Sequence, residues 1–382
     1  MRFDTTPHPF YCGIDLHART MYVCILDQAG ETRLHRTMPA PPEALRKAIA
    51  PSHAQIVLAA ACMFPWDWLA DLCAAHGIPC VLGHALSMKA IHGGKAKNDK
   101  IDAQKIAALL RGGLLPQAYV YPAERRATRD LLRRRMHLAR QRGALLAHVQ
   151  HTNSQDTLPA IGKKIASKAT RDGVAERWAD PAVHKSIDVD LALITYDEAL
   201  LRDVELSLVT TAKDHDAHTL YLLQTVPGIG KSLSLVLRYE IHDIARFPRG
   251  QDVASYCRLI TGARASAGKR SGPSGAPIGN AHLKWAFSEA AVFFLRDNPA
   301  APTLRSRLEQ KHGKGKALTI LAHTLARAVY DRWKRQTACA LQQCLRAEGR
   351  GVGARNASLD NQGMHLIRNA QPTVKTGVVA RP

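Results

Sequence analysis

The chain has 382 residues, 46% of them hydrophobic, which is enough for two or three domains with substantial cores. Its net charge of +21 indicates a polyanionic partner, and nucleic acid is the first candidate. The eight cysteines form no CxxC pair, no apolar run approaches a membrane span, and the N-terminus lacks a signal-peptide core. These features argue against a disulfide or zinc scaffold and a membrane partner, and they favour a cytoplasmic location.

The positive charge is unevenly distributed along the chain. The first 90 residues contain seven Lys or Arg and seven Asp or Glu, so the whole excess follows them. A neutral domain followed by a basic remainder suggests that the first part carries the catalytic residues and that the second part binds nucleic acid.

The N-terminal part alternates strand and helix patterns. Strands are predicted at Tyr11–Leu16, Met21–Leu26, Thr32–Met38, Gln55–Ala60 and Ile78–Leu82, and helices at Pro41–Ala50, Phe64–His76 and Asp99–Arg111. The order β-β-β-α-β-α-β suggests a mixed sheet covered by helices, which is the pattern of an RNase H-like domain.

The middle of the chain predicts two long helices. One starts at Pro122 and repeats leucine every seven residues at Leu131, Leu138 and Leu145. After a loop-rich stretch over 152–185, the second helix is expected at Ser186–Asp214. Two such helices usually form an antiparallel or intermolecular coiled coil.

The C-terminal part begins near Leu220 and is mostly helical. The segment Val226–Gly230 (VPGIG) forms a hairpin between helices, residues 262–280 are rich in Gly and Ser, and helices resume at Ala281–Arg296 and Lys316–Lys334. After about Ala347 the sequence loses periodicity, which predicts a disordered tail.

Three aspartates are candidate metal ligands. Asp15 ends an apolar strand, where it either is a hydrogen-bonded strand end or binds a cation. Asp99 and Asp102 lie three residues apart, so they share a helix face. They either stabilise the helix start, with Asp99 as the N-cap, or offer two oxygen ligands to a hard cation.

Three basic segments are candidate nucleic-acid contacts. The first long helix carries eight arginines and few acids to balance them, namely Arg125, Arg126, Arg129, Arg133, Arg134, Arg135, Arg140 and Arg142. The VPGIG hairpin resembles a helix-hairpin-helix element, in which Gly228, Gly230 and Lys231 would hold a phosphate. A smaller cluster spans Lys311–Lys316 and is either a solvated surface or a nucleic-acid contact.

The segment Ser266–Gly272 (SAGKRSG) is small, flexible and basic. Its glycines would let a phosphate approach, and Lys269 and Arg270 would neutralise that phosphate. A serine there could be a nucleophile, with Ser271 and Ser274 as rivals to Ser266 on composition alone. The alternative is an ordinary Gly/Ser loop.

Taken together, these motifs resemble the DEDD-type serine transposases of bacterial insertion sequences, described as bridge-RNA-guided recombinases. The resemblance runs from about Tyr11 to Lys334. It rests on the order and spacing of four segments: GIDLH at 13–17, KNDKIDA at 97–103, SAGKR at 266–270 and IGNAHLKWA at 278–286.

The resemblance implies an α/β plus α architecture. It comprises an RNase H-like (RuvC-like) domain over 9–121, a coiled-coil or linker region over 122–217, a mostly helical C-terminal serine transposase domain with its helix-hairpin-helix element over 218–340, and the tail over 347–382. It also implies a bacterial cytoplasmic protein that assembles from dimers into a tetramer, in which one subunit's carboxylates act with another's serine.

The same resemblance implies the chemistry. Asp15, Asp99 and Asp102 would bind Mg²⁺ (or Mn²⁺), and Ser266 would attack a DNA phosphate, forming a phosphoserine link that needs no ATP for rejoining. A structured guide (bridge) RNA would pair with both donor and target DNA, so that the protein reads shape and backbone.

One position departs from the family pattern. The family's four acids are Asp, Glu, Asp and Asp, and Ala61 stands where the Glu is expected. A methyl group cannot bind a cation, so we expect weakened Mg²⁺ binding and impaired cleavage, with nucleic-acid binding kept. Two other functions remain open: a metal-dependent nuclease of the Holliday-resolvase kind, and a catalytically dead nucleic-acid-binding protein.

Overall fold

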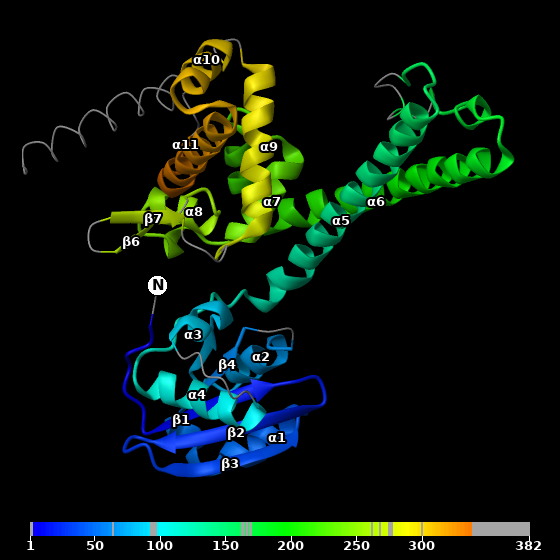
Figure 1. Cartoon of the computed structure of the whole chain (residues 1–382). Coiled ribbons are helices and arrows are strands. Elements are labelled where there is room, and N and C mark those ends of the chain that lie inside the picture. Colours follow the sequence, from blue (N-terminus) through cyan, green and yellow to red (C-terminus); the bar gives the residue numbers. More distant parts are fainter. Residues whose placement is uncertain are drawn as a thin grey trace, which may run out of the picture. The chain divides into compact units, whose positions relative to one another are not determined.

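The computed structural model describes residues 3–62, 65–91, 98–161, 165, 167, 170–260, 263–266, 269–273, 278–298 and 301–337, and for 90, 263–266 and 270–273 it describes the backbone alone. The predicted tail over 347–382 lies outside these residues. The chain divides into two compact units, Met1–Ala127 and Thr128 onward (Figure 1). Of the described helices, none is long and apolar enough to cross a lipid bilayer.

The first unit is built on one mixed sheet of five strands. These are β1 (Phe10–Leu16), β2 (Thr20–Asp27), β3 (Thr32–Pro39), β4 (Ile56–Ala61) and β5 (Cys80–Gly83). Their spatial order is β3-β2-β1-β4-β5, with β2 antiparallel to both β1 and β3, and β1, β4 and β5 mutually parallel. The prediction of a mixed sheet with five strands is confirmed.

Helices cover both faces of this sheet (Figure 1). They are α1 (Pro42–Ile49), the 3-10 helix η1 (Ala50–Gln55), α2 (Asp67–Ala75), α3 (Ala85–Ile91) and α4 (Asp99–Arg111). On one face Leu45 of α1 and Leu69 of α2 pack with Ile14. On the other, Ile106 of α4 packs with Tyr11 and Ala59. The central strands β1 and β4 are therefore buried on both sides, which explains their continuous apolar sequences.

Two long helices follow, α5 (Ala123–Gln155) and α6 (Pro181–Gln224), with the short η4 (Ala175–Arg177) between them. They run antiparallel, because three side-chain contacts join them in opposite sequence order: the ion pairs Arg135–Glu205 and Arg142–Glu198 (2.7 Å), and the hydrogen bond between His148 and Asp190 (2.5 Å). The predicted end of the second helix at Asp214 falls beside a kink at Asp216 (φ −175°, ψ 82°), beyond which α6 continues to Gln224.

The rest of the second unit packs around a single core. Its elements are α7 (Lys231–Ile241), η5 (Ile244–Arg246), α8 (Gly250–Tyr256), β6 (Ala263–Ser266), β7 (Lys269–Pro273), α9 (Ala281–Asp297), α10 (Ala301–His312) and α11 (Lys314–Arg335). The buried side chains of α7, α9 and α11 form its centre. An ordinary Gly/Ser loop, one of the two interpretations of Ser266–Gly272, is corrected for its described residues: backbone pairing joins Ala263–Ser266 to Lys269–Pro273 as the hairpin β6–β7. Helices α3, α8 and α10 were not predicted, because α3 and α8 have only seven residues each and α10 is mostly polar, so none shows a clear apolar period.

Candidate metal centre

Three potential metal ligands converge at the end of β1. The Nε2 atom of His17 lies 3.5 Å from an oxygen of Asp15 and 3.5 Å from an oxygen of Asp99. The ligand atoms of these three residues all lie within 4.8 Å of one another. Asp15 is mostly buried, with its side chain 20% exposed, whereas Asp99 is 60% exposed. The cluster therefore opens to solvent on one side.

The fold brings these residues together from positions more than eighty apart in the sequence. Asp15 shares its strand face with Tyr11 and Gly13, the face covered by α4, because the intervening Cys12 and Ile14 enter the opposite core. At Gly13 a Cβ atom would overlap the backbone of Ala103 and Ala107. A glycine at this point lets α4 lie against β1, so that the first residue of α4 reaches the end of the strand.

The start of α4 shows which residue caps the helix. Asn98 is the N-cap, and its side chain accepts a hydrogen bond from the backbone N–H of Ile101 (2.8 Å). The interpretation of Asp99 as the N-cap is therefore wrong. Asp99 occupies the next position, where an acid is favoured by the helix dipole but makes no capping bond.

Asp102 lies on the next turn of α4 and is not part of the group within 4.8 Å. Its carboxylate is 26% exposed and lies 4.0 Å from the Nζ atom of Lys105. Among the described residues, the cluster thus contains two of the three aspartates singled out from the sequence. It also contains His17, the last residue of the GIDLH segment.

Ala61 ends β4, the strand next to β1. The parallel register pairs Ile14 with Ala60, so Ala61 follows at the same level as Asp15. Ala61 packs with Val57 and Ala59 on the α4 side of the sheet, the same side to which Asp15 belongs. A longer side chain at position 61 would therefore extend from the sheet face that carries Asp15.

The donor set fits a divalent cation. Two carboxylates supply the hard oxygen ligands preferred by Mg²⁺ and Mn²⁺, and the imidazole of His17 adds a nitrogen that Mn²⁺ accepts more readily than Mg²⁺. Their open side leaves room for a phosphate oxygen or water to complete the shell.

A second histidine lies at the same sheet edge. His84 directly follows β5, whose carboxyl end points the same way as those of β1 and β4. Burial lowers the pKa of His84, and its Nδ1 atom lies 2.8 Å from the hydroxyl of Ser87. No sequence motif singles out His84, because a single histidine after a strand is common.

The candidate nucleophile Ser266 lies at the end of β6, opposite Lys269 of β7. Lys269 is exposed. The side chains of Ser266, Arg270 and Ser271, and the whole of Ser274, lie outside the described residues, so their roles stay predictions.

Most arginines of the arginine-rich helix α5 lie beside acids, which its sequence did not indicate. Six of its eight arginines lie within 4.0 Å of a carboxylate: Arg125, Arg126, Arg129, Arg133, Arg135 and Arg142. The expectation that few acids balance this charge is wrong, because most of the acids come from distant elements. Arg134 and Arg140 are exposed and have no ion pair within the described part of the chain.

The centre of this pairing is Glu240 on α7, which is fully buried. It accepts hydrogen bonds from Arg129 (2.9 Å), Arg133 (2.7 Å) and the side-chain amide of Asn280 (2.7 Å). Burial alone would raise the pKa of Glu240, but Arg133, Arg129 and Asn280 outweigh it and lower the pKa to about 2. Arg129 and Arg133 thus hold α5 to the core of the second unit.

The VPGIG segment joins α6 to α7, as predicted. Gly228 has φ +84°, and a Cβ atom there would lie 2.8 Å from the backbone N of Phe294 on α9. Gly230 is the N-cap of α7, with open space around its Cα, and Lys231 is exposed. Gly228 is therefore required for packing, whereas Gly230 and Lys231 are available to a ligand.

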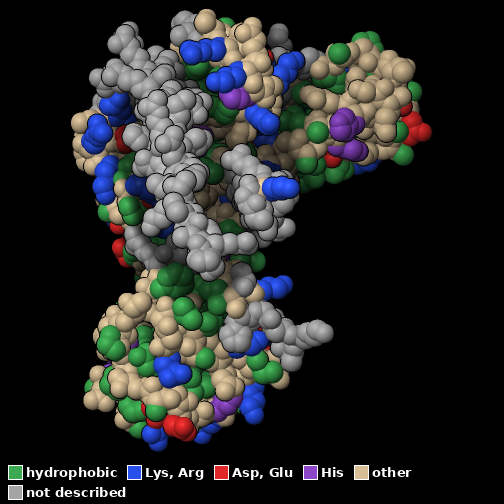
Figure 2. Space-filling model, turned by 60° about the vertical axis from the view of Figure 1, so that its left-hand side comes forward, with side chains coloured by type: hydrophobic (Ala, Val, Ile, Leu, Met, Phe, Trp, Pro, Cys, Tyr) green, Lys and Arg blue, Asp and Glu red, His purple; other side chains and the backbone are tan. Residues whose placement is uncertain are grey.

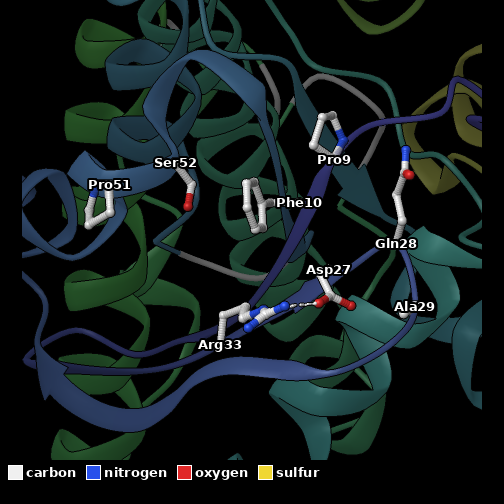
Figure 3. Close-up of a pocket in the computed structure, with 8 residues that line it drawn as sticks. All are labelled: Pro9, Phe10, Asp27, Gln28, Ala29, Arg33, Pro51 and Ser52. Atoms are coloured by element: carbon white, nitrogen blue, oxygen red, sulfur yellow. Dashed lines mark hydrogen bonds and ion pairs between the residues drawn. The ribbon is translucent and has the colours of Figure 1, made fainter.

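A hollow of about 550 Å³ lies at the opposite edge of the sheet, near the start of β1 (Figure 3). Phe10 lines it together with Asp27 and Arg33, which form an ion pair of 2.6 Å. Figure 3 shows these two charged side chains directed toward each other. None of the predicted site residues lines this hollow, so we do not assign the chemistry to it.

Comparison with known families decides the class of protein. Residues 12–152 match a model of DEDD-type transposases, and residues 220–305 match a model described as the transposase IS116/IS110/IS902 family. The chain belongs to this family of insertion-sequence transposases. Its substrate is therefore DNA, and its general activity is that of a DNA transposase or recombinase. No protein of curated function matches the chain significantly.

The two matches coincide with the two candidate sites. The first covers β1 to α5 and so includes Asp15, Ala61 and Asp99, and the second covers the hairpin with Ser266. The DEDD class suggests that this transposase uses a divalent metal, in agreement with the cluster at the end of β1.

Proposed function

We propose that this transposase cuts and rejoins DNA with a divalent cation, Mg²⁺ or Mn²⁺, at the Asp15–Asp99 cluster and with Ser266 as the nucleophile. The observation that carries the proposal is the convergence of Asp15, His17 and Asp99, in a transposase, at one end of a five-stranded sheet. The strand order and the helices on both faces support an RNase H-like class for this domain.

Asp15 and Asp99 would hold the cation, with His17 as a third ligand and Asp102 on the adjacent turn as a further acid. A bound cation would supply positive charge that stabilises the reacting phosphate. The cluster's open side is where the phosphate would enter.

The second part of the proposal is a covalent step at Ser266. The serine oxygen forms a bond to phosphorus as the bond from phosphorus to the departing sugar oxygen breaks, and the hydroxyl proton passes to a base. Reversal with a new sugar hydroxyl rejoins DNA and releases the serine. The number of phosphoester bonds stays constant, so no external energy source is needed.

The nucleic-acid contacts proposed here are the exposed Arg134 and Arg140 of α5, the α7 start at Gly230 and Lys231, and the hairpin residues Lys269 and Arg270. The remaining arginines of α5 are proposed to stabilise the fold, because acids neutralise their charge. A structured guide RNA that pairs with donor and target DNA is the proposed source of sequence specificity, since phosphate contacts carry none.

A homo-oligomer is the proposed working form. Helix α6 presents exposed apolar side chains at Val189 (46%), Leu193 (39%) and Tyr196 (62%), spaced at three and four residues. Such a stripe on a long helix fits a partner helix from another subunit.

The test is an SDS-resistant protein–DNA adduct, sought with element-end DNA, target DNA, Mg²⁺ and co-purified RNA. The chain as it stands should give little adduct, Ala61→Glu should give more, and adding Ser266→Ala to Ala61→Glu should abolish it. Mg²⁺-dependent nicking that survives Ser266→Ala would instead establish the hydrolytic nuclease. DNA binding without any cleavage in Ala61→Glu would establish the non-catalytic binding protein.

A further inference from the structure

Cations without acid partners gather where α10 meets α11. Arg307 and Lys311 lie four residues apart on α10, and Lys314 and Lys316 begin α11. All four are exposed, and none forms an ion pair with another described residue. The acid nearest in sequence, Glu309, is bound by Arg305 (2.8 Å). We call these four residues the α10–α11 cluster.

This cluster differs from the arginine-rich face of α5. There, six cations are matched by carboxylates, so much of the charge is internally neutralised. At the α10–α11 turn the charge is fully presented to solvent. Figure 2 shows blue Lys and Arg side chains at the end of the second unit that carries α10 in Figure 1.

The start of α11 is also unfavourable for helix stability. Its first turn contains Lys314, Gly315 and Lys316 and no acid, and its N-cap Gly313 provides no side-chain cap. Cations at a helix N-terminus are repelled by the dipole, and glycine is a weak helix former. The starts of α4, α6 and α9 are instead capped by side chains, namely those of Asn98, Asp180 and Asn280. An anion beside these lysines would offset their repulsion by the helix dipole.

The turn is accessible to a bulky anion. A Cβ atom at Gly313 or Gly315 would meet no atom of the described residues within 4 Å, so none of their side chains shields the backbone there. Neither α10 nor the first turn of α11 contains Phe, Tyr or Trp, and His312 at the end of α10 is the one ring in these two segments on which an unpaired base could stack. The chemistry therefore suits a charged backbone rather than exposed bases.

We propose that the α10–α11 cluster grips the phosphate backbone of duplex DNA without reading its sequence. This inference rests on the proposed function, in which the protein acts on DNA. The cluster follows residue 305, where the second family match ends, so the family assignment does not account for it.

The experiment measures binding of the full chain to fluorescent duplex DNA of arbitrary sequence over a series of KCl concentrations. The test variant is Lys311→Ala/Lys314→Ala/Lys316→Ala, and Lys→Arg at the same positions serves as the charge-conserving rescue. A matched control, Lys213→Ala/Lys334→Ala/Arg335→Ala, removes three other exposed charges and so has the same net charge. Circular dichroism checks that all variants fold.

Each phosphate contact contributes about 0.9 to the slope of log affinity against log salt, so the test variant should lose about 2 to 3 from the slope. The Lys→Arg variant and the matched control should keep the slope of the parent chain. If the test variant keeps the slope of the parent chain, or loses no more of it than the matched control does, the proposal is overturned. Failure of the parent chain to bind duplex DNA would refute the proposed function itself and this inference with it.

Discussion

Gly13 of β1 and Ala103 of α4 touch backbone to backbone, and this contact sets the position of the metal cluster. A Cβ atom at Gly13 would overlap the carbonyl oxygen of Ala103 and lie 3.0 Å from the Cα of Ala107. Because Asp15 follows Gly13 by two residues and Asp99 precedes Ala103 by four, the close contact brings the two carboxylates to one place.

Replacing Gly13 by alanine should therefore both destabilise the protein and separate the ligands. We expect a loss of about 1–3 kcal/mol in the free energy of unfolding, typical of overpacking, together with weaker Mn²⁺ binding. Urea unfolding and a Mn²⁺ titration measure the two effects. Gly143→Ala in α5 is the control, since its Cβ would meet nothing within 4 Å and the change should be neutral or slightly stabilising.

Ala61→Glu should strengthen divalent cation binding, and His17→Ala should weaken it. The first change adds a carboxylate at the level of Asp15 on the same sheet face, and the second removes a nitrogen ligand. Calorimetric titration with Mn²⁺ and Mg²⁺ checks both. An affinity that Ala61→Glu leaves unchanged would contradict the assignment of position 61, and a greater loss for Mn²⁺ than for Mg²⁺ in His17→Ala would support direct ligation.

Glu240 should make the second unit sensitive to acid. Its pKa is lowered from 4.5 to about 2, so its stabilising contribution is complete above pH 4.5 and is lost as the pH falls toward 2. At about 1.4 kcal/mol for each unit of pKa, the loss amounts to about 3 kcal/mol. Glu240→Gln should remove most of this pH dependence and cost about 3–5 kcal/mol at pH 7, because Arg129 and Arg133 lose their partner. Unfolding curves between pH 7 and pH 2 would show whether the two proteins converge in acid.

The long helices offer a paired test of buried and exposed ion pairs. Glu198 accepts hydrogen bonds from Arg142 (2.9 Å) and from Arg171 (2.5 Å), whose side chain is only 4% exposed. Glu205 pairs with Arg135 and is itself 39% exposed. Glu198→Ala should therefore cost about 3 kcal/mol, and Glu205→Ala about 1 kcal/mol or less. Thermal unfolding measures both losses of stability. Equal losses for the two variants would contradict the expected difference between the buried and the exposed ion pair.

Replacing each of two glycines of the same hairpin by alanine should affect folding differently. Gly228→Ala meets both a φ of +84° and the backbone of α9, so it should destabilise the fold by more than about 1 kcal/mol. Gly230→Ala meets open space and an ordinary backbone conformation, so folding should be unaffected. A loss of DNA affinity in Gly230→Ala with unchanged thermal stability would support phosphate contact there. Unchanged affinity would leave the hairpin with a purely structural role.

The local sequence was a good guide to the elements of the first unit. Short runs of β-branched and apolar residues predicted all five strands to within about two residues, and the segment at 99–111 was placed correctly as a helix. Predictions failed where the local pattern was weak. The hairpin β6–β7 is rich in Gly and Ser, and α10 is a short polar helix, so neither has a clear period.

Whether the basic residues of α5 and of 311–316 are paired with acids could not be predicted from the sequence. Eight arginines on one helix indicated a free basic surface, because the neighbouring sequence holds few acids. Most of the acids that pair with them lie more than fifty residues away, namely Asp71 on α2, Glu198 and Glu205 on α6, and Glu240 on α7. Lys311, Lys314 and Lys316 form no ion pair with any other residue that the structure describes, because the nearest acid in the sequence, Glu309, is bound by Arg305.

The sequence by itself determined the strands, the long helices, the candidate aspartates and the family to which their motifs point. These depend on local periodicity and on residue types at fixed spacing, which need no knowledge of distant contacts. Only the tertiary structure decided that His17 lies beside Asp15 and Asp99. It also decided that Asn98 rather than Asp99 caps α4. The ion pairs that Glu240 forms with Arg129 and Arg133 likewise became apparent only in the folded chain. The physical reason is that ligand geometry and charge neutralisation depend on distances through space, which are set when helices pack on the sheet and on one another.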